Sequence, residues 1–597
     1  MMNVMKKYIF MLLTGMMLVS CMDTIILPDD KTVDEDFWKT KEDVASMVNG
    51  AYAAMTSEAV LARLIVWGDF RTDEVLQSSA VTDVSTTTQD LDEIAAVNMQ
   101  TTNMFATWSA FYDVINRCNI VLQRASEVML IDPNYTEGDY QVDCSQMLAL
   151  RALCYFYLVR NFRDVPFITT AFMNSSQNTQ LEQSAPAAVI NQCIADLEEC
   201  LPMAMSPRSF STTEWRRVGW FTSDGIAALL ADLYLWRASV THNAADYDQC
   251  IAYCDRVIAS KKSQHVRGRN ELVEKEYPLA DASEMYYDLY VAQNAEESIF
   301  ELQSRSNLPD CQYYYKYKKA NANAGTGWLR ATPIFAANTA HTTYNATTIV
   351  SSSMLFSTND MRYYAACYVP AQGQDAYDIR KLVSENRVMS KDLVKTRESY
   401  DYAGFDRNYI IYRLSDVMLM KAEALVQLAE TTPEGATDEE KEEINERNEQ
   451  TLRPAFNLIQ AVNTRALYEE SQGDSIKWNT FRTYTKTQFE QLVLQERMRE
   501  FCFEGRRWYD LLRYNYRHVD GVDYNTILAN QSTLPKNYDD MLNLMTRQRG
   551  TDANGVKAKM RNEAFLYMPI PNSDILVCPM LKQNPAYGSS NEYKKSY

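Results

Sequence analysis

The chain has 597 residues, of which 46% are hydrophobic, and a formal net charge of −19 at pH 7. So acidic a chain repels phosphate backbones and anionic headgroups, so nucleic acid is not expected as a partner and polyanionic glycans are disfavoured. Neutral or cationic ligands stay open, because a local patch can override net charge. The 12 cysteines and 4 histidines show neither CxxC nor HExxH spacing, so no metal site is expected. No P-loop, GxGxxG or GxSxG motif occurs, and no cofactor is predicted.

The first 20 residues have the layout of an export signal. Two lysines precede an apolar run from Tyr8 to Val19, which is too short to span a bilayer. A serine and Cys21 end this run, and the segment resembles a bacterial lipobox, in which cleavage leaves a lipidated N-terminal cysteine. We therefore predict a signal peptide over 1–20, then the lipidated Cys21 with a tether over 21–32. No later apolar run approaches spanning length, so the lipid would be the membrane anchor. The alternative is an ordinary signal peptide with an incidental cysteine.

Helical spacing of apolar residues dominates two long stretches, 33–260 and 409–597. The pattern predicts a first helix that starts near Val33. Further helices are predicted over 104–130, 142–160, 185–201, 222–240, 246–260, 409–430, 439–467 and 486–514. They come largely in pairs, and pairs stacked in series indicate a mostly α, tetratricopeptide-like scaffold.

The stretch 261–408 differs, because helical periodicity fades and Tyr, Asn, Ala, Thr and Gly dominate. We predict an irregular, loop-rich subdomain that carries the ligand site, since binding residues concentrate on loops held by rigid elements. Tyr313, Tyr314, Tyr315 and Trp328 gather where no helix needs them. Such rigid, amphipathic rings suit glycan or peptide capture. The alternative is that these rings pack the subdomain together.

Five segments in a fixed order resemble the SusD/RagB family of nutrient-uptake lipoproteins. They are LALRALCYFYLVRNFRDVPFIT from Leu148, YRLSDVMLMKAEAL from Tyr412, LIQAVNTRA from Leu458, ERMREFCFEGRRWYDLLRY from Glu496 and YMPIPNSDILVCPMLKQNPAY from Tyr567. The chain departs from the family pattern at Cys578, where Asn is usual, and at Ala586, where Gly is usual. The resemblance covers nearly the whole chain after the signal.

The resemblance implies a function as well as a fold. It implies a surface-exposed, lipid-anchored protein of the outer membrane that captures oligosaccharide or polysaccharide without turnover. The captured glycan would pass to a SusC-like TonB-dependent transporter, over which the lipoprotein acts as a lid. It also places ligand-binding residues between the first helix and the helix around Trp108, where Asp69, Arg71 and Asp73 are the matching polar candidates. The alternative for these three is an ion-paired turn.

Glu496, Glu500 and Glu504 lie four residues apart on one helix face, with arginines in reach. Acid/base catalysis needs one carboxyl with a raised pKa, whereas a guanidinium beside each keeps all of them ionised. The row is therefore interpreted as an ion-paired scaffold, and the chain is not expected to be an enzyme. Three alternatives to glycan capture stay open: peptide capture by a protein of the same family, a surface hydrolase, and a purely structural helical-repeat scaffold.

Overall fold

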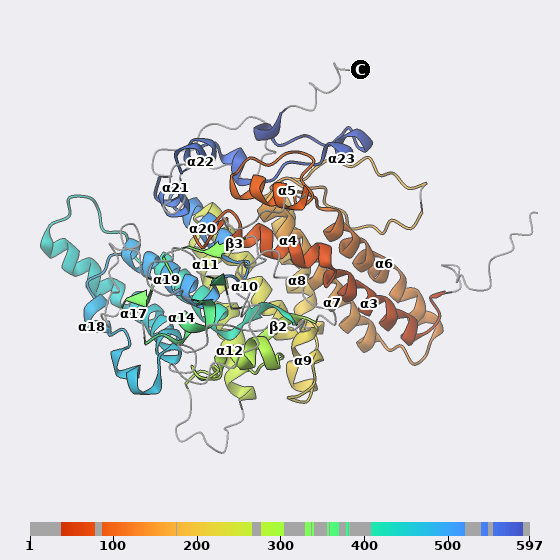
Figure 1. Ribbon diagram of the computed structural model, residues 1–597. Coiled ribbons are helices and arrows are strands. Elements are labelled where there is room, and N and C mark those ends of the chain that lie inside the picture. Colours follow the sequence, from red (N-terminus) through yellow and green to blue (C-terminus); the bar gives the residue numbers. More distant parts are fainter. Residues whose placement is uncertain are drawn as a thin grey trace, which may run out of the picture.

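The computed structural model describes residues 37–77, 86–174, 176–265, 276–303, 407–519, 539–546 and 553–588, with shorter pieces between 329 and 381. The N-terminal part is almost entirely helical (Figure 1). Its elements are α3 (Lys41–Met55), α4 (Glu58–Asp69), β1 (Val75–Gln77), α5 (Thr86–Ala95), α6 (Ser109–Ile131), α7 (Glu137–Phe162), α8 (Pro186–Cys200), η1 (Leu201–Met203), η2 (Pro207–Ser209), α9 (Arg216–Gly219), α10 (Ser223–Thr241) and α11 (Ala244–Gln264). Sequential helices pack as neighbours, α6 on α7, α7 on α8 and α10 on α11.

The middle part contains short strands and single helical turns. Its elements are α12 (Met285–Tyr287), η3 (Asp288–Ala292), β2 (Ser298–Leu302), β3 (Leu329–Ala331), β4 (Ala337–Asn338), β5 (Phe356–Ser357), α14 (Met361–Ala366), β6 (Cys367–Tyr368) and β7 (Asp378–Ile379). Each strand has one partner: β1 pairs with β3 and β6 with β7, both antiparallel, and β4 pairs with β5 in parallel. β2 pairs antiparallel with a strand of the C-terminal part.

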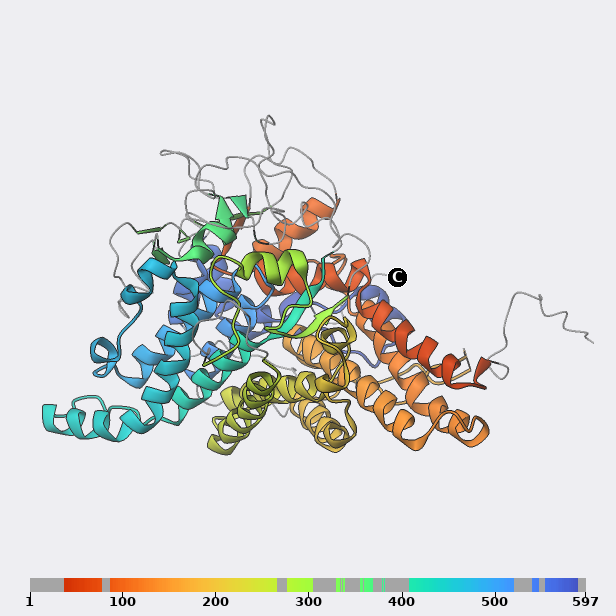
Figure 2. The same cartoon turned by 90° about the horizontal axis from the view of Figure 1, so that it is seen from below.

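The C-terminal part returns to helices. Its elements are β8 (Tyr409–Arg413), α16 (Leu414–Leu428), α17 (Asp438–Ala466), η5 (Glu469–Asp474), α18 (Trp478–Phe481), α19 (Lys486–Phe501), α20 (Arg507–Arg517), α21 (Asp539–Thr546), α22 (Ala553–Met560), η8 (Glu563–Leu566), α23 (Asn572–Val577) and η9 (Pro585–Tyr587). α16 packs on α11, α17 and α19, so it joins the two helical parts. The long helices line one side of the molecule and the short strands between 329 and 381 lie on the other (Figure 2). The predicted mostly helical, tetratricopeptide-like architecture is confirmed.

Local sequence explains where several helices begin. Thr40, Thr136, Thr437 and Thr485 are N-caps, and each side chain accepts a hydrogen bond from the backbone N–H three residues later. In each case the side chain of that later residue bonds back to the cap. Such reciprocal capping boxes satisfy two backbone donors that the first turn leaves unpaired.

The structure corrects two of the predicted helices. The segment 409–430 begins with the strand β8 and not with a helix. The prediction failed because Tyr409–Arg413 is a fully buried run, which periodicity alone cannot distinguish from a helix. The segment 486–514 is two helices, broken where Phe503 and Gly505 take positive φ values of 62° and 71°. Gly505 adopts its positive φ in this turn at low cost, because it has no Cβ.

One hydrophobic core runs through all three parts of the chain and includes residues of α4, α7, β2, α16 and α20. α7 is long and apolar enough by composition to cross a membrane, which the sequence did not lead us to expect. However, 78% of its apolar window is buried in the protein, so α7 is a core helix. The boundaries predicted at 32/33, 260/261 and 408/409 stay predictions.

Candidate functional site

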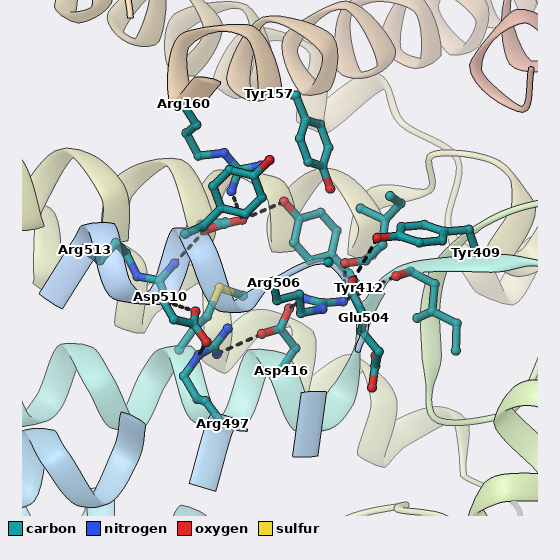
Figure 3. A pocket seen from close by; sticks show the side chains of 16 residues that line it. Tyr157, Arg160, Tyr409, Tyr412, Asp416, Arg497, Glu504, Arg506, Asp510 and Arg513 are labelled. Carbon is teal, nitrogen blue, oxygen red and sulfur yellow. Dashed lines mark hydrogen bonds and ion pairs between the residues drawn. The ribbon is translucent and has the colours of Figure 1, made fainter. Parts of the chain in front are cut away.

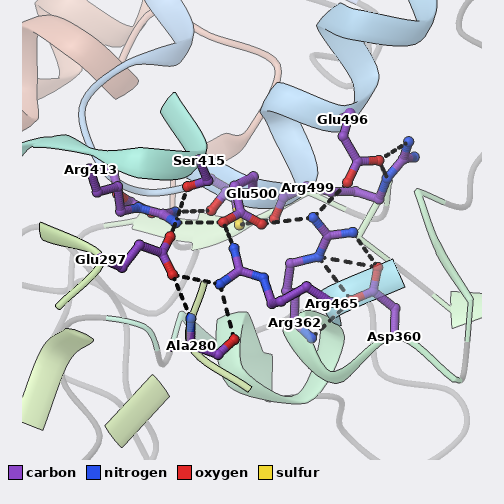
Figure 4. A network of polar contacts seen from close by, with 12 residues as sticks. Ala280, Glu297, Asp360, Arg362, Arg413, Ser415, Arg465, Glu496, Arg499 and Glu500 are labelled. Atoms are coloured by element: carbon purple, nitrogen blue, oxygen red, sulfur yellow. Dashed lines mark hydrogen bonds and ion pairs between the residues drawn. The ribbon is translucent and has the colours of Figure 1, made fainter. Parts of the chain in front are cut away.

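Glu496, Glu500 and Glu504 are buried and ion-paired. The ion pairing was predicted, but the single helix face was not correct, because α19 ends at Phe501 and Glu504 lies in the turn after it. Glu500 is fully buried and faces Arg362 Nη1 at 2.9 Å, Arg413 Nη1 at 2.5 Å and Arg465 (Figure 4). Burial alone would raise the pKa of Glu500, but the three guanidinium groups hold it well below its usual value. A carboxylate in this state cannot donate a proton near neutral pH.

The neighbouring carboxylates are held in the same way. Glu496 accepts hydrogen bonds from Arg362 Nη1 at 2.8 Å and from Arg499 Nη2 at 2.9 Å. Glu504 contacts Lys381 Nζ at 2.6 Å and Arg413 Nη2 at 3.0 Å, and these cations outweigh burial and lower its pKa to about 2. Arg499 is a partner that the helix pattern suggested, whereas Arg362, Lys381, Arg413 and Arg465 reach these carboxylates from distant segments.

A second polar cluster lies beside the first, between α16, α19 and α20 (Figure 3). Asp416 pairs with Arg497 Nη1 at 2.9 Å and with Arg506, and Asp510 pairs with Arg497 and Arg513. The cavity between these side chains measures about 30 Å³, which holds a water molecule or two but no sugar ring. Both clusters therefore form an internal frame and not a ligand site.

This frame holds the described pieces of the loop-rich region. Arg362 fixes α14 on α19, and Lys381 donates a hydrogen bond to the carbonyl oxygen of Glu500 at 2.7 Å. Thr332, just after β3, bonds to the carbonyl oxygens of Asp73 and Glu74 at 2.8 and 2.9 Å. The strand that directly follows Trp328 in the sequence is thus attached to the helical scaffold.

The sequence-predicted residues fall into two groups. Tyr313, Tyr314, Tyr315, Trp328 and Cys21 lie outside the described residues. Asp69, Arg71 and Asp73 are described, and each is fully buried.

The three buried residues join the N-terminal part to the C-terminal part. Asp73 makes two ionic hydrogen bonds to Arg507, at 2.8 and 3.0 Å. Arg71 donates to the carbonyl oxygen of Leu566 at 2.8 Å, and its guanidinium carbon lies 3.8 Å from the ring centroid of Trp508. Asp69 accepts a hydrogen bond from the N–H of Gly505 at 3.2 Å. The Asp73–Arg507 pair agrees with the alternative of an ion-paired turn, whereas the bonds given above for Arg71 and Asp69 go to backbone groups. None of the three side chains reaches the surface.

Two open clefts adjoin each other on the described surface and share Glu296. The smaller measures about 340 Å³ and has carboxylates on its wall, among them Asp281 and Glu284. The larger measures about 540 Å³ and is lined by Arg208, Arg217 and Lys261. Both volumes fall in the range of small-molecule sites. Sequence reasoning did not single out either cleft.

Metal coordination finds no support in the described ranges. Within them, no three His, Cys, Asp or Glu side chains gather in a way that could hold a metal ion.

Comparison with known proteins gives consistent matches along the chain. Residues 296–587 match the model of the SusD family, and residues 27–235 match a model described as "Starch-binding associating with outer membrane". The SusD-like protein P38 of Formosa agariphila is 25% identical over 546 residues, which cover 86% of this chain and 92% of the relative. The SusD-like protein P2 of the same organism is 23% identical over 555 residues, covering 85% and 91%.

Solved structures share the fold. A SusD homologue from Bacteroides thetaiotaomicron superposes with a TM-score of 0.66 at 17% identity, covering 93% of this chain and 99% of that one. The NanU protein of B. fragilis superposes with a TM-score of 0.59 at 18% identity, covering 94% and 100%.

Proposed function

The chain belongs to the SusD/RagB family, and from that premise we propose that it is a glycan-binding lipoprotein of the outer membrane. It captures oligosaccharide or polysaccharide at the cell surface and passes it to a SusC-like TonB-dependent transporter. The observation that carries the proposal is the match of residues 27–235 to a family described as starch-binding and associated with the outer membrane. The two Formosa agariphila relatives, named SusD-like, span most of the chain and support it.

The state of the buried carboxylates favours binding over hydrolysis. A glycosidase pairs one ionised carboxylate with one carboxylic acid whose pKa is raised. Glu496, Glu500 and Glu504 all have lowered pKa values, because the arginine and lysine partners outweigh burial. They are also enclosed in the frame, where no substrate reaches them.

In this proposal the ligand contacts come from Tyr313, Tyr314, Tyr315 and Trp328. Aromatic rings stack on the C–H faces of sugars, and nearby polar groups bond to the hydroxyls. Transport requires release, so we expect a Kd between roughly micromolar and millimolar, equivalent to about −8 to −4 kcal/mol.

The test is calorimetry with the soluble chain from Asp23 onward against a panel of neutral polysaccharides, acidic polysaccharides and peptides. The same samples are assayed for released reducing ends and cleaved peptides. Saturable binding to a glycan without product is the expected result. Binding of peptides alone would replace glycan capture with peptide capture, and product formation would establish a hydrolase.

Trp328→Ala examines the proposed ligand contact. We expect the variant to bind the identified glycan about 1–3 kcal/mol more weakly, as when an aromatic anchor is removed. A melting curve that matches the wild type shows that the variant is folded. Unchanged affinity in the folded variant would assign Trp328 to packing.

Cys21→Ala examines the anchor in the full-length chain. We expect the variant to move from the membrane fraction to the soluble fraction, since the lipid would be its attachment. A variant that stays in the membrane fraction would contradict the lipoprotein assignment.

A further inference from the structure

The larger open cleft lies where η2 and α9 meet the end of α11 and the segment that leads into β2. Arg208 is exposed at this cleft, and Arg217 and Lys261 are buried in its wall. Asn294 and Glu296 also line it, and their backbone carbonyl oxygens accept hydrogen bonds from Arg217 and Lys261. Figure 1 places α9 at the lower edge of the molecule, below β2. Of the sequence-predicted binding residues that the structure describes, Asp69, Arg71 and Asp73 do not line this cleft.

The cleft is cationic although the chain as a whole is acidic. Three of its lining side chains are Arg or Lys, and Glu296 is the only carboxylate among the described lining residues. Arg217 is 7% exposed and donates to the carbonyl oxygens of Asn294 and Ala295 at 3.0 and 3.1 Å. Lys261 donates to the carbonyl oxygens of Glu296 and Ser298 at 2.7 and 2.5 Å. These bonds go to neutral carbonyl groups. The carboxylates that act on the two cations are Asp224 and Glu296 for both, with Glu301 near Arg217 and Glu297 near Lys261.

Among the described residues, Glu296 is the carboxylate that lines the cleft itself, and Arg208 is the exposed cation there. Glu296 is engaged by His265 Nδ1 at 2.9 Å. Arg208 donates one bond, to the carbonyl oxygen of Ser263 at 2.9 Å. Asp224 is buried behind the wall and accepts hydrogen bonds from Ser260 and Gln264. A charged patch of this kind acts locally, because salt screens exposed charges beyond about 8–10 Å.

An aromatic cluster extends from the same wall. Phe210 lines the cleft, and Trp220 lies edge-on to both Phe210 and Trp215, with ring centroids 6.3 and 6.2 Å apart. The Arg216 guanidinium lies 5.3 Å from the Trp220 centroid and 5.6 Å from that of Phe210. Trp215 is 40% exposed, an unusual position for so large an apolar ring.

The Trp215 ring is held in place from beneath. A Cβ on Gly219 would lie 2.7 Å from Cε3 of Trp215, so the ring rests directly on the glycine backbone. A ring fixed in this way loses little conformational entropy when a ligand stacks on it. The cluster is thus a prepared stacking surface beside a cationic cleft.

We propose that this cleft and the exposed face of Trp215 form a second saccharide site, which takes a sugar bearing a carboxylate or sulfate group. The inference rests on the proposed glycan-binding function and adds a ligand class to it. The Arg208 guanidinium matches the planar geometry of a carboxylate and also pairs with sulfate oxygens. The sugar ring stacks on Trp215, and Asn294 and Gln264 supply polar groups for hydroxyls. The neighbouring cleft, with Asp281 and Glu284, repels the same ligands.

The experiment measures binding of hexagalacturonate, its methyl ester and a chondroitin 4-sulfate hexasaccharide to the soluble chain from Asp23 onward. The methyl ester keeps the sugar rings and removes the charge. We expect the two acidic probes, or one of them, to bind at least tenfold more tightly than the ester, with affinity falling between 50 and 200 mM salt. Chondroitin 4-sulfate carries carboxylates as well as sulfates, so tighter binding of this probe than of hexagalacturonate indicates that sulfate contributes.

Arg208→Gln and Trp215→Ala locate the site. Each should weaken binding of the acidic probe at least tenfold, and Trp215→Phe should weaken it less. Arg117→Gln is the matched control, because Arg117 is an exposed arginine that pairs with Asp113 on α6; its affinity should equal that of the wild type. Trp215→Ala is compared with the wild type by melting curve to show that it is folded.

Two results would overturn the inference. The first is acidic-probe binding within twofold of the wild type in both Arg208→Gln and folded Trp215→Ala. The second is a wild-type protein that binds a neutral glycan but neither acidic probe, which would leave the proposed function standing. A protein that binds no glycan of any kind would instead overturn the proposed function, and the second site with it.

Discussion

Glu500 shows how one residue holds several segments together. Its carboxylate meets Arg362, Arg413 and Arg465, which come from α14, β8 and α17. Removing the charge leaves three guanidinium groups buried with too few acceptors, which typically costs about 3–5 kcal/mol. We therefore expect Glu500→Gln to lower the melting midpoint clearly.

The control for this substitution is Glu449→Gln. Glu449 pairs with Arg453 at 3.0 Å, but its side chain is 49% exposed. A surface pair of this kind contributes at most about 1 kcal/mol, so the control should melt within a degree or two of the wild type. Equal midpoints for the two variants would contradict a structural role for Glu500.

Glu74 is the opposite case, a buried carboxyl group whose pKa is raised. Burial and the nearby Asp69 raise its pKa well above the usual value, and Arg507 opposes them only in part. A raised folded-state pKa contributes stability below about pH 4.5, and that contribution is lost as the pH rises toward the folded value. Glu74→Gln removes this dependence. We expect the variant to gain melting temperature relative to the wild type between pH 4.5 and 7.5; a constant difference would show that Glu74 is ionised in the fold.

Single residues also mark the limit of what the sequence predicts about the site. The carboxylate row that begins on α19 was predicted to be ion-paired because its charges lie close in sequence. The burial of Asp69, Arg71 and Asp73 was not foreseen as the leading interpretation, because their partners Gly505, Leu566 and Arg507 are more than 400 residues away. The Trp215-Arg216-Arg217 run was visible in the sequence, but only the fold places Lys261 beside it.

The backbone of α4 packs directly against the backbone of the turn that precedes α20. A Cβ on Gly68 would lie 2.0 Å from the carbonyl oxygen of Gly505. The obstacle is backbone, which cannot rotate away as a side chain would. We expect Gly68→Ala to destabilise the protein by about 3 kcal/mol or more, measured by urea unfolding.

Gly555→Ala is the matched control. Gly555 lies in α22, and nothing stands within 4 Å of a Cβ built there. Alanine is the better helix former by about 1 kcal/mol, so this variant should be as stable as the wild type or slightly more stable. A Gly68→Ala protein with wild-type stability would mean that α4 and the turn can separate.

At the level of elements, amphipathic periodicity was sufficient to predict most long helices. It failed for Tyr409–Arg413, where all five residues are buried and no polar face reveals the period. It also missed α4, in which ten consecutive residues from Val60 to Asp69 are buried. In both cases the segment is buried on every side, so its sequence lacks the alternation of apolar and polar residues from which secondary structure is predicted.

For the whole molecule, stability should pass through a maximum as the pH changes. One set of buried carboxyl groups has lowered pKa values and another set has raised pKa values. Glu504 has a pKa near 2 in the fold against 4.5 when unperturbed, because the Arg413 and Lys381 cations overcome burial. It therefore loses its contribution, on the order of 3 kcal/mol, as the pH falls from about 4.5 to 2. Asp143 behaves oppositely, since burial raises its pKa from 3.8 to about 6.

Glu423, Glu490, Glu496 and Glu500 share the direction of Glu504, so the acid side should be the steeper one. We expect the melting midpoint to be highest near pH 5 and to fall sharply below pH 4. Above pH 5 it should decline gently as Asp143, with a pKa of about 6, and Glu74 ionise in the fold. Melting curves between pH 2.5 and 8 measure it. A midpoint that stays constant from pH 5 to pH 3 would contradict the buried ionic frame.

The joining of Asp73 to Arg507 also bears on how the chain acquires its structure. Asp73 emerges early in synthesis, and its partner Arg507 emerges 434 positions later. At typical synthesis rates of about 5–20 residues per second, that interval lasts roughly 20–90 s. Throughout it, the face of α4 that packs on α20 lacks this cover. We expect truncations near the C-terminus to aggregate instead of forming smaller folded units.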